Sequence, residues 1–304
     1  MSGHSGELLA LVTAVFWTAS SQLFEAASRR IGSLTVNLLR LPLAFVLLSL
    51  FNLARRGLWF PSDATGRTWV LLLLSGILGF SVGDLFLFKS FTMVGARVAM
   101  LIQALAPMFA AVLSWILLEE RLQLKSLLGM GVTLTGVSLV ILTSETRNSK
   151  SDRAQTGLRF SHSPAGILLA LGAAIATAAG MVLSKMGMGA YDAFAATQIR
   201  VIAGMAGFLL IFGALNRWGR LGDAMKNRRA LALLSAGTVF GPFLGVSFAL
   251  LSIQRTAVGI AFTLMALVPV LIIPPAVIFG HERVRPKEIF GAVLAVAGAS
   301  IFFL

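Results

Sequence analysis

Cysteine is absent from this 304-residue sequence, and charged side chains make up only 12% of it. The missing cysteine excludes disulfides, thiolate metal sites and cysteine nucleophiles. A soluble domain usually carries about 25% charged residues on its surface and in its loops. The low charge therefore argues against a water-soluble protein.

Motifs for catalysis or metal binding are also missing. The sequence contains no Walker loop, HExxH motif or dinucleotide fingerprint, and no convincing nucleophile elbow. The three histidines are dispersed outside the apolar runs and predict no metal site, namely His4, His162 and His281. We therefore expect no enzyme activity, no cofactor and no ATP-driven pumping by this chain alone.

Long apolar runs dominate instead. Hydrophobic residues make up 57% of the sequence, the mean hydropathy is +0.89, and runs of about 20 apolar residues alternate with short charged clusters. The first run begins near Glu7 without a preceding basic region, which predicts a retained helix and not a signal peptide. We predict ten transmembrane helices, at Glu7–Ala27, Leu34–Ala54, Thr68–Phe88, Val94–Leu118, Ser126–Thr143, Ala165–Ser184, Ala193–Asn216, Ala230–Leu251, Ala257–Phe279 and Pro286–Phe303.

The formal charge of +13 comes from basic residues that fall mostly in loops. This pattern is typical of topology determinants and lipid contacts, so we expect a bilayer as partner and no nucleic acid. Sixteen Lys and Arg lie in the loops of one face and seven in the loops of the other. By the positive-inside rule both termini lie outside the cell.

The two halves of the sequence repeat one another. At a shift of 160, GELLAL at Gly6 matches GILLAL at Gly166, and Arg40 matches Arg200. At a shift of 162 the matches are denser: Gly79, Gly83, Phe86, Ser90, Pro107, Glu120–Arg121, Lys125, Gly129 and Gly136 meet Gly241, Gly245, Phe248, Ser252, Pro269, Glu282–Arg283, Lys287, Gly291 and Gly298. Ordered matches of Arg, Pro, Gly and Glu-Arg indicate a duplication.

An odd number of helices in each repeat has a topological consequence, because the second copy must enter the membrane from the opposite side. We therefore predict an all-α membrane protein whose ten transmembrane helices form two inverted five-helix repeats. The repeats cover residues 1–143 and 165–304, with a polar linker at 144–164. Inverted repeats are common in secondary transporters, whose substrate site lies near the membrane midplane.

These features resemble a known family. A fourth helix with a proline, a following Glu-Arg pair and a fifth helix with glycines seven apart recur in both halves. The order is similar to that of EamA-type members of the drug/metabolite transporter superfamily, which include YddG-like amino-acid and metabolite exporters. The resemblance implies a ten-helix transporter with its termini inside, in conflict with the charge count. The stretch AVFWTASSQLF lacks the acid that related four-helix multidrug transporters carry in helix 1, which argues against export of cationic drugs.

Arg40 and Arg200 are the most informative charges, because each lies about two turns inside a predicted helix. An intramembrane arginine costs roughly 2.5 kcal/mol or more to insert, so either a role or snorkelling to the headgroups must offset it. We predict a structural ion pair between Arg40 and Asp84, which lie at similar depth. The position that matches Asp84 in the second repeat is Val246, so Arg200 is left to bind a substrate carboxylate, to pair with Asp192 or to face solvent.

Polar residues inside the helices complete the candidate site. We predict that the substrate contacts Trp17, Gln22, Gln103, Lys185, Gln198 and Arg200; interhelical hydrogen bonding is the alternative for each. Helix packing or hinge motion is predicted at Gly79, Gly83, Pro107, Gly241, Gly245 and Pro269.

We therefore expect a secondary transporter, and specifically an exporter of amino acids or related small metabolites, in a bacterial-type cell inner membrane. The alternatives are transport of drugs or of sugar-linked or phosphorylated metabolites, a membrane enzyme acting on lipid, and a receptor or scaffold.

Overall fold

The computed structural model describes residues 4–144, 163–214, 219–278 and 285–304. These residues form helices and connecting turns, without a strand. Ten helical stretches are long and apolar enough to cross a membrane, as the sequence predicted: Ser5–Ile31, Ser33–Arg56, Gly66–Leu87, Val98–Leu118, Leu124–Thr143, Pro164–Met188, Ala193–Ala214, Arg228–Arg255, Val258–Pro275 and Pro286–Phe303.

The first repeat contains α1 (Ser5–Ile31), α2 (Ser33–Arg56), α3 (Gly66–Gly76), the π-helix η1 (Ile77–Gly83), α4 (Asp84–Gln103), α5 (Ala106–Leu118) and α6 (Leu124–Ser144). The second contains α7 (Pro164–Met188), α8 (Ala193–Ala214), α9 (Gly219–Lys226), α10 (Arg228–Thr238), the π-helix η3 (Val239–Gly245), α11 (Val246–Arg255), α12 (Val258–Met265), α13 (Val268–Leu271), α14 (Ile273–Ile278), α15 (Pro286–Ser300) and η4 (Ile301–Phe303).

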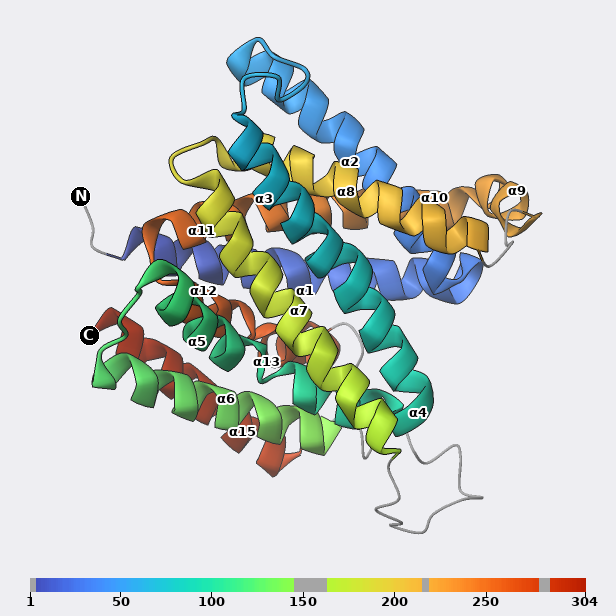
Figure 1. Ribbon diagram of the computed structural model, residues 1–304. Helices are drawn as coiled ribbons and strands as arrows, with labels where there is room; N and C mark the ends of the chain where they lie inside the picture. Colours follow the sequence, from blue (N-terminus) through green and yellow to red (C-terminus); the bar gives the residue numbers. More distant parts are fainter. Residues whose placement is uncertain (1–3, 145–162, 215–218, 279–284) are drawn as a thin grey trace, which may run out of the picture.

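The two repeats interlock through matched helix pairs (Figure 1). Helix α1 packs on α10, η3 and α11 of the second repeat, and its counterpart α7 packs on α3, η1 and α4 of the first. The second helices α2 and α8 pair with each other, as do the fifth helices α6 and α15. Helix α1 begins and η4 ends at one end of the bundle, here called the terminal side (Figure 1). The opposite end, where α6 ends and α7 begins, is called the linker side.

Glycine allows the fifth helices to approach closely. A Cβ on Gly136 would overlap the backbone nitrogen of Ala295, and one on Gly298 would overlap that of Thr133. Gly136 and Gly298 are the two ends of one internal match, so the same contact is made from both sides of the symmetry axis. In lipid such small-residue contacts are a main source of helix association.

Proline breaks the fourth helix of each repeat at the same place. Pro107 and Pro269 lack an N–H and clash with the carbonyl four residues earlier, at Gln103 and Met265. Helix α4 ends at Gln103 and α12 ends at Met265, and a new helix begins directly before each proline. The sequence predicted that the third helix ends at Phe88 and the fourth begins at Val94. The structure instead has one continuous helix, α4, from Asp84 to Gln103, and the chain leaves the helix only just before Pro107, because the proline and not the local polarity sets the break.

Each third helix contains a π-helical segment, and η1 and η3 match one another at the shift of 162. A Cβ on Gly83 would lie 3.1 Å from the Leu78 carbonyl oxygen, and one on Gly245 would lie 2.6 Å from that of Phe240. The wider turn brings the carbonyl five residues back against each glycine, so a side chain has little space there.

One helix was not predicted, and two predicted features lie outside the described residues. Helix α9, on the linker side between α8 and α10, was not predicted. Most of the predicted linker 144–164 and the Glu282–Arg283 pair lie outside the described residues.

Candidate functional site

A cavity of about 480 Å³ lies between the repeats. Its lining reaches from Asp84 and Leu87 on the linker side to Met181, Ala249 and Phe262 in the terminal-side halves of their helices. It is lined by Trp17, Ser20, Ser21, Phe24, Arg40, Gly79, Phe80, Asp84, Leu87, Gln103, Thr177, Met181, Arg200, Gly241, Pro242, Val246, Ala249, Phe262 and Val268. The volume is that of a small-molecule site, and the lining is largely apolar with a few polar groups, as such sites usually are.

Arg200 is the polar group of this cavity that lacks a charged partner. Its side chain comes from α8 and is only 4% exposed, with the guanidinium carbon 5.2 Å from the Phe80 ring centroid. The Nε and Nη1 atoms are buried and have no hydrogen-bond partner, and no carboxylate among the described residues forms a salt bridge with it. Asp192, the protein partner considered from the sequence, pairs with Arg55 instead. A buried, unpaired cation is costly and indicates a missing anionic partner.

The predicted contact between Arg40 and Asp84 is present. Arg40 Nη2 donates to Asp84 Oδ2 at 3.1 Å. The side chain of Arg40 is 20% exposed and that of Asp84 is 26% exposed. The Arg40 guanidinium also lies over the Phe24 ring, 5.4 Å from its centroid. Both arginines thus stack on a phenylalanine, but only the first repeat supplies a carboxylate, since Val246 stands where the second would have one.

Trp17 and Gln103 also line the cavity, as predicted. Gln103 Nε2 donates to the Thr177 hydroxyl at 3.3 Å, while its Oε1 is buried without a partner. Trp17 lies against Gly245, where a Cβ would come within 2.7 Å of the indole. At matched positions, Thr177 replaces Trp17 in the second repeat, and the indole therefore makes one wall of the cavity bulky and apolar.

Three predicted contacts lie outside the cavity. Gln22 is exposed, because the lining face of α1 runs through Trp17, Ser20, Ser21 and Phe24, and Gln22 falls off that helical phase. Gln198 is fully buried and donates to the Ser49 hydroxyl and the Trp59 carbonyl while accepting from Asn52. It precedes Arg200 by two residues and so faces away from the cavity.

Lys185 is the third. It lies near the end of α7, about two turns beyond Thr177, and forms an ion pair of 2.5 Å with Glu120. Its ammonium also donates to the Thr256 carbonyl at 2.7 Å. The structure thus places Lys185 in a contact between repeats and not beside Arg200.

The predicted glycines contact the site from two sides. A Cβ on Gly79 would lie 3.2 Å from Arg200 Nη2, and one on Gly241 would lie 3.0 Å from the Phe24 ring. A Cβ on Gly83 would lie 3.1 Å from the Thr177 hydroxyl oxygen, so glycine lets both π-helical segments approach the cavity walls. Pro107 and Pro269 lie at the helix breaks beside it.

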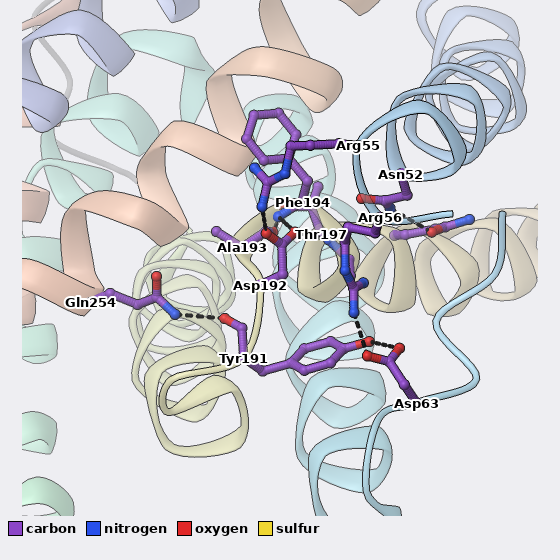
Figure 2. A network of polar contacts seen from close by, with 12 residues as sticks. Asn52, Arg55, Arg56, Asp63, Tyr191, Asp192, Ala193, Phe194, Thr197 and Gln254 are labelled. Carbon is purple, nitrogen blue, oxygen red and sulfur yellow. Dashed lines mark hydrogen bonds and ion pairs between the residues drawn. The ribbon is translucent and has the colours of Figure 1, made fainter. Parts of the chain in front are cut away.

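A network of polar contacts ties the repeats together on the terminal side (Figure 2). Arg55 at the end of α2 forms an ion pair with Asp192, which also accepts from the first amides of α8. Asp63 forms an ion pair with Arg56 and accepts from the Tyr191 hydroxyl at 2.8 Å. These contacts join the α2–α3 and α7–α8 connections, which come from different repeats.

Further contacts extend this network. Gln254 at the end of α11 donates to the Tyr191 carbonyl at 2.7 Å. Glu120 accepts from the Val258 backbone amide at 2.9 Å in addition to its pair with Lys185, and the Thr256 hydroxyl donates to Glu7 at 2.7 Å. Polar contacts thereby join helices of both repeats at the terminal side.

The pKa values of two side chains in these connections, Tyr191 and Asp63, are shifted. Burial raises the pKa of Tyr191 to about 12, and its hydrogen bond to the Asp63 carboxylate acts in the same direction. Burial also acts to raise the pKa of Asp63, but the hydrogen bond from Tyr191 and the charge of Arg56 outweigh it, so this pKa is lower than usual. Both shifts favour a neutral tyrosine that donates to an ionised aspartate.

The sequence interpretation missed Phe24 and Phe80 beside the arginines and the whole Tyr191–Asp63 network. The sequence did contain a signal for the network. An inverted fold places the 57–63 and 189–192 connections on the same face, and these contain Asp63 and Asp192, whose charge is opposite to that of Arg55 and Arg56 at the end of the second helix. In the described part of the chain, no group of three or more His, Asp or Glu residues is arranged to hold a metal ion.

The comparison with known proteins agrees with this architecture. A solved crystal structure superposes on the chain with a TM-score of 0.75 at 20% sequence identity, covering 99% of this chain and 96% of the other, which shows a shared fold. No curated protein matches the sequence. The model of the EamA-like transporter family matches residues 4–142 and again residues 164–304. With two such matches over nearly its whole length, the chain belongs to the EamA-like transporter family and is a multi-pass membrane transporter of small molecules.

Proposed function

We propose that the protein is a secondary transporter that exports amino acids or related carboxylate-bearing metabolites across the cell inner membrane by alternating access. The observation that carries this proposal is Arg200, a buried guanidinium that lines the central cavity and has no carboxylate partner in the described protein. A carboxylate accepts charge-assisted hydrogen bonds from such a group and offsets the cost of its burial.

The rest of the cavity fits a small, partly apolar solute. Trp17, Phe80 and Phe262 supply apolar surface, and the unpartnered Oε1 of Gln103 is an acceptor for an ammonium or hydroxyl group. The described charges of the lining are Arg40, Asp84 and Arg200, which sum to a net positive charge. That charge disfavours a quaternary cation, because a like charge in a low-dielectric cavity is repelled.

Alternating access is supported by the cavity between the inverted repeats and by the polar contacts that join the repeats on the terminal side. The export direction and the inner-membrane location rest on the family resemblance. The Arg40–Asp84 pair has a structural role in this scheme, and the matched prolines and π-helical segments serve as hinges for the motion.

The test is transport by purified protein in liposomes. Uptake and efflux of a panel of labelled amino acids, simple carboxylates and quaternary ammonium cations are measured against protein-free vesicles. We expect saturable transport of at least one carboxylate-bearing solute and none of the cations. Transport confined to cations, or none of any solute by folded protein, would refute the proposal.

A further inference from the structure

The contacts that join the two repeats on the terminal side form a set that we call the terminal latch. It consists of the ion pairs Arg55–Asp192 and Lys185–Glu120 and of the chain Arg56–Asp63–Tyr191. Each of the three joins a residue before position 143 to one after position 164. By contrast, the ion pairs Arg29–Glu25 and Arg40–Asp84, nearer the linker side, both lie within the first repeat.

Internal symmetry shows what stands at the equivalent positions of the opposite end. At the shift of 160, Asp192 corresponds to Gly32, Tyr191 to Ile31 and Lys185 to Glu25. Glu25 is exposed and forms an ion pair with Arg29 of its own helix. At the shift of 162, Glu120 corresponds to Glu282, so the pair Lys185–Glu120 becomes two acids in the inverted arrangement.

In an inverted-repeat carrier, closing the second side amounts to an exchange of conformation between the two repeats. The contacts that close one side would then be repeated at the other by the corresponding residues. Gly32 and Ile31 cannot form an ion pair or a phenol hydrogen bond, and two glutamates repel each other. Closure of the linker side therefore lacks all three elements of the terminal latch.

We propose that the terminal latch acts on one side only and sets the resting state, so that the substrate-free protein stays closed on the terminal side with its cavity open to the linker side. This inference rests on the proposed alternating-access function. Each partly exposed ion pair changes an equilibrium by a factor of about 1.5 to 5. Three contacts together then favour the latched state by a factor of about 3 to 125.

The absence of cysteine makes a direct test simple, since a single introduced cysteine is the only thiol. Thr197 of α8 is fully buried, just beneath the terminal latch (Figure 2), and Thr197→Cys reports opening of the terminal side. Ser21 is exposed in the cavity wall, and Ser21→Cys reports access from the linker side. The rate of reaction with a hydrophilic maleimide is measured for purified protein in nanodiscs without substrate.

The latch variants keep the local hydrogen bonds. Asp192→Asn removes the charge that pairs with Arg55 but still accepts from the first amides of α8. Glu120→Gln removes the partner of Lys185 and still accepts from the Val258 amide. The matched control is Glu119→Gln, which makes the same charge change at the exposed neighbour of Glu120, outside the terminal latch.

We expect the double variant Asp192→Asn/Glu120→Gln to label Thr197→Cys about 2- to 25-fold faster, as the loss of two contacts implies, and Ser21→Cys more slowly, and the control to change neither rate. The slower labelling of Ser21→Cys distinguishes a shift of this equilibrium from a merely destabilised fold, which would label both reporters faster. An unchanged rate at Thr197→Cys in the double variant, or equally fast labelling of both reporters in the otherwise unchanged protein, overturns the inference. Because labelling needs no substrate, its outcome is separate from that of the liposome assay.

Discussion

The guanidinium of Arg200 lies against Gly79, in a space that only glycine leaves open. A Cβ at Gly79 would come within 3.2 Å of Arg200 Nη2, closer than most side-chain contacts. We expect Gly79→Ala to push the arginine back by a few tenths of an ångström and to weaken solute binding severalfold, because a misplaced group binds its partner less well. The measurement is the concentration dependence of transport in liposomes. Gly213→Ala, where a Cβ meets nothing, is the control and should transport normally.

The ion pair between Arg40 and Asp84 should contribute to folding. Asp84→Asn removes the counter-charge of a largely buried arginine, and we expect a loss of about 1–3 kcal/mol in stability. Glu25→Gln, which breaks an exposed pair, should cost less than about 0.5 kcal/mol. Thermal unfolding in detergent, followed by circular dichroism, compares the two. Equal midpoints for both variants would mean that the pair has no structural role.

The helix breaks at Pro107 and Pro269 should matter for motion more than for stability. Alanine restores an amide N–H and removes the clash with the carbonyl of Gln103 or Met265, so each variant can continue its helix. We expect Pro107→Ala to keep or raise the unfolding temperature while transport falls at least severalfold. A variant that transports like the unchanged protein would assign the proline to helix packing alone.

Tyr191 is the only tyrosine of the chain, so tyrosinate absorbance reports this residue by itself. Burial and the hydrogen bond to Asp63 raise the pKa of Tyr191 from 10.0 to about 12. A raised pKa means that the contribution of this hydrogen bond to stability is complete below pH 10 and is lost as the pH rises through the folded value. We expect Asp63→Asn to move the titration midpoint down toward 10, because the acceptor loses its charge. A midpoint near 10 in the unchanged protein would contradict the partly buried, hydrogen-bonded position of Tyr191.

Much of the fold could be predicted from the sequence, because the periodic features that define it are local. Apolar runs, the matched Arg40 and Arg200, and the matched glycines and prolines were sufficient for ten helices in two inverted repeats. At the π-helical segments the sequence indicated only glycines for packing or hinge motion, at Gly79, Gly83, Gly241 and Gly245, since the sequence does not show which carbonyl an amide will bind. The unbroken α4 was missed because the break depends on Pro107.

The residues of the site were harder to predict than the fold, because a residue lines the cavity only if it lies on the right face of its helix. Arg200, Trp17 and Gln103 could be singled out as polar or bulky groups inside helices, and they line the cavity. Gln198 and Lys185 carry the same signal, yet each is bound by other protein groups. Polarity alone does not separate a residue that binds a solute from one that binds a neighbouring helix, and that decision is made by tertiary packing.

Arg200 is the residue on which the proposed transport depends most, and one measurement tests its role directly. Transport of the best amino-acid substrate in liposomes is compared for the unchanged protein, Arg200→Gln and the control Arg121→Gln, whose side chain is exposed at the terminal side. We predict that Arg200→Gln elutes as folded protein but transports at least tenfold more slowly, whereas Arg121→Gln transports normally. Normal transport by folded Arg200→Gln would contradict the assignment of the substrate carboxylate to Arg200.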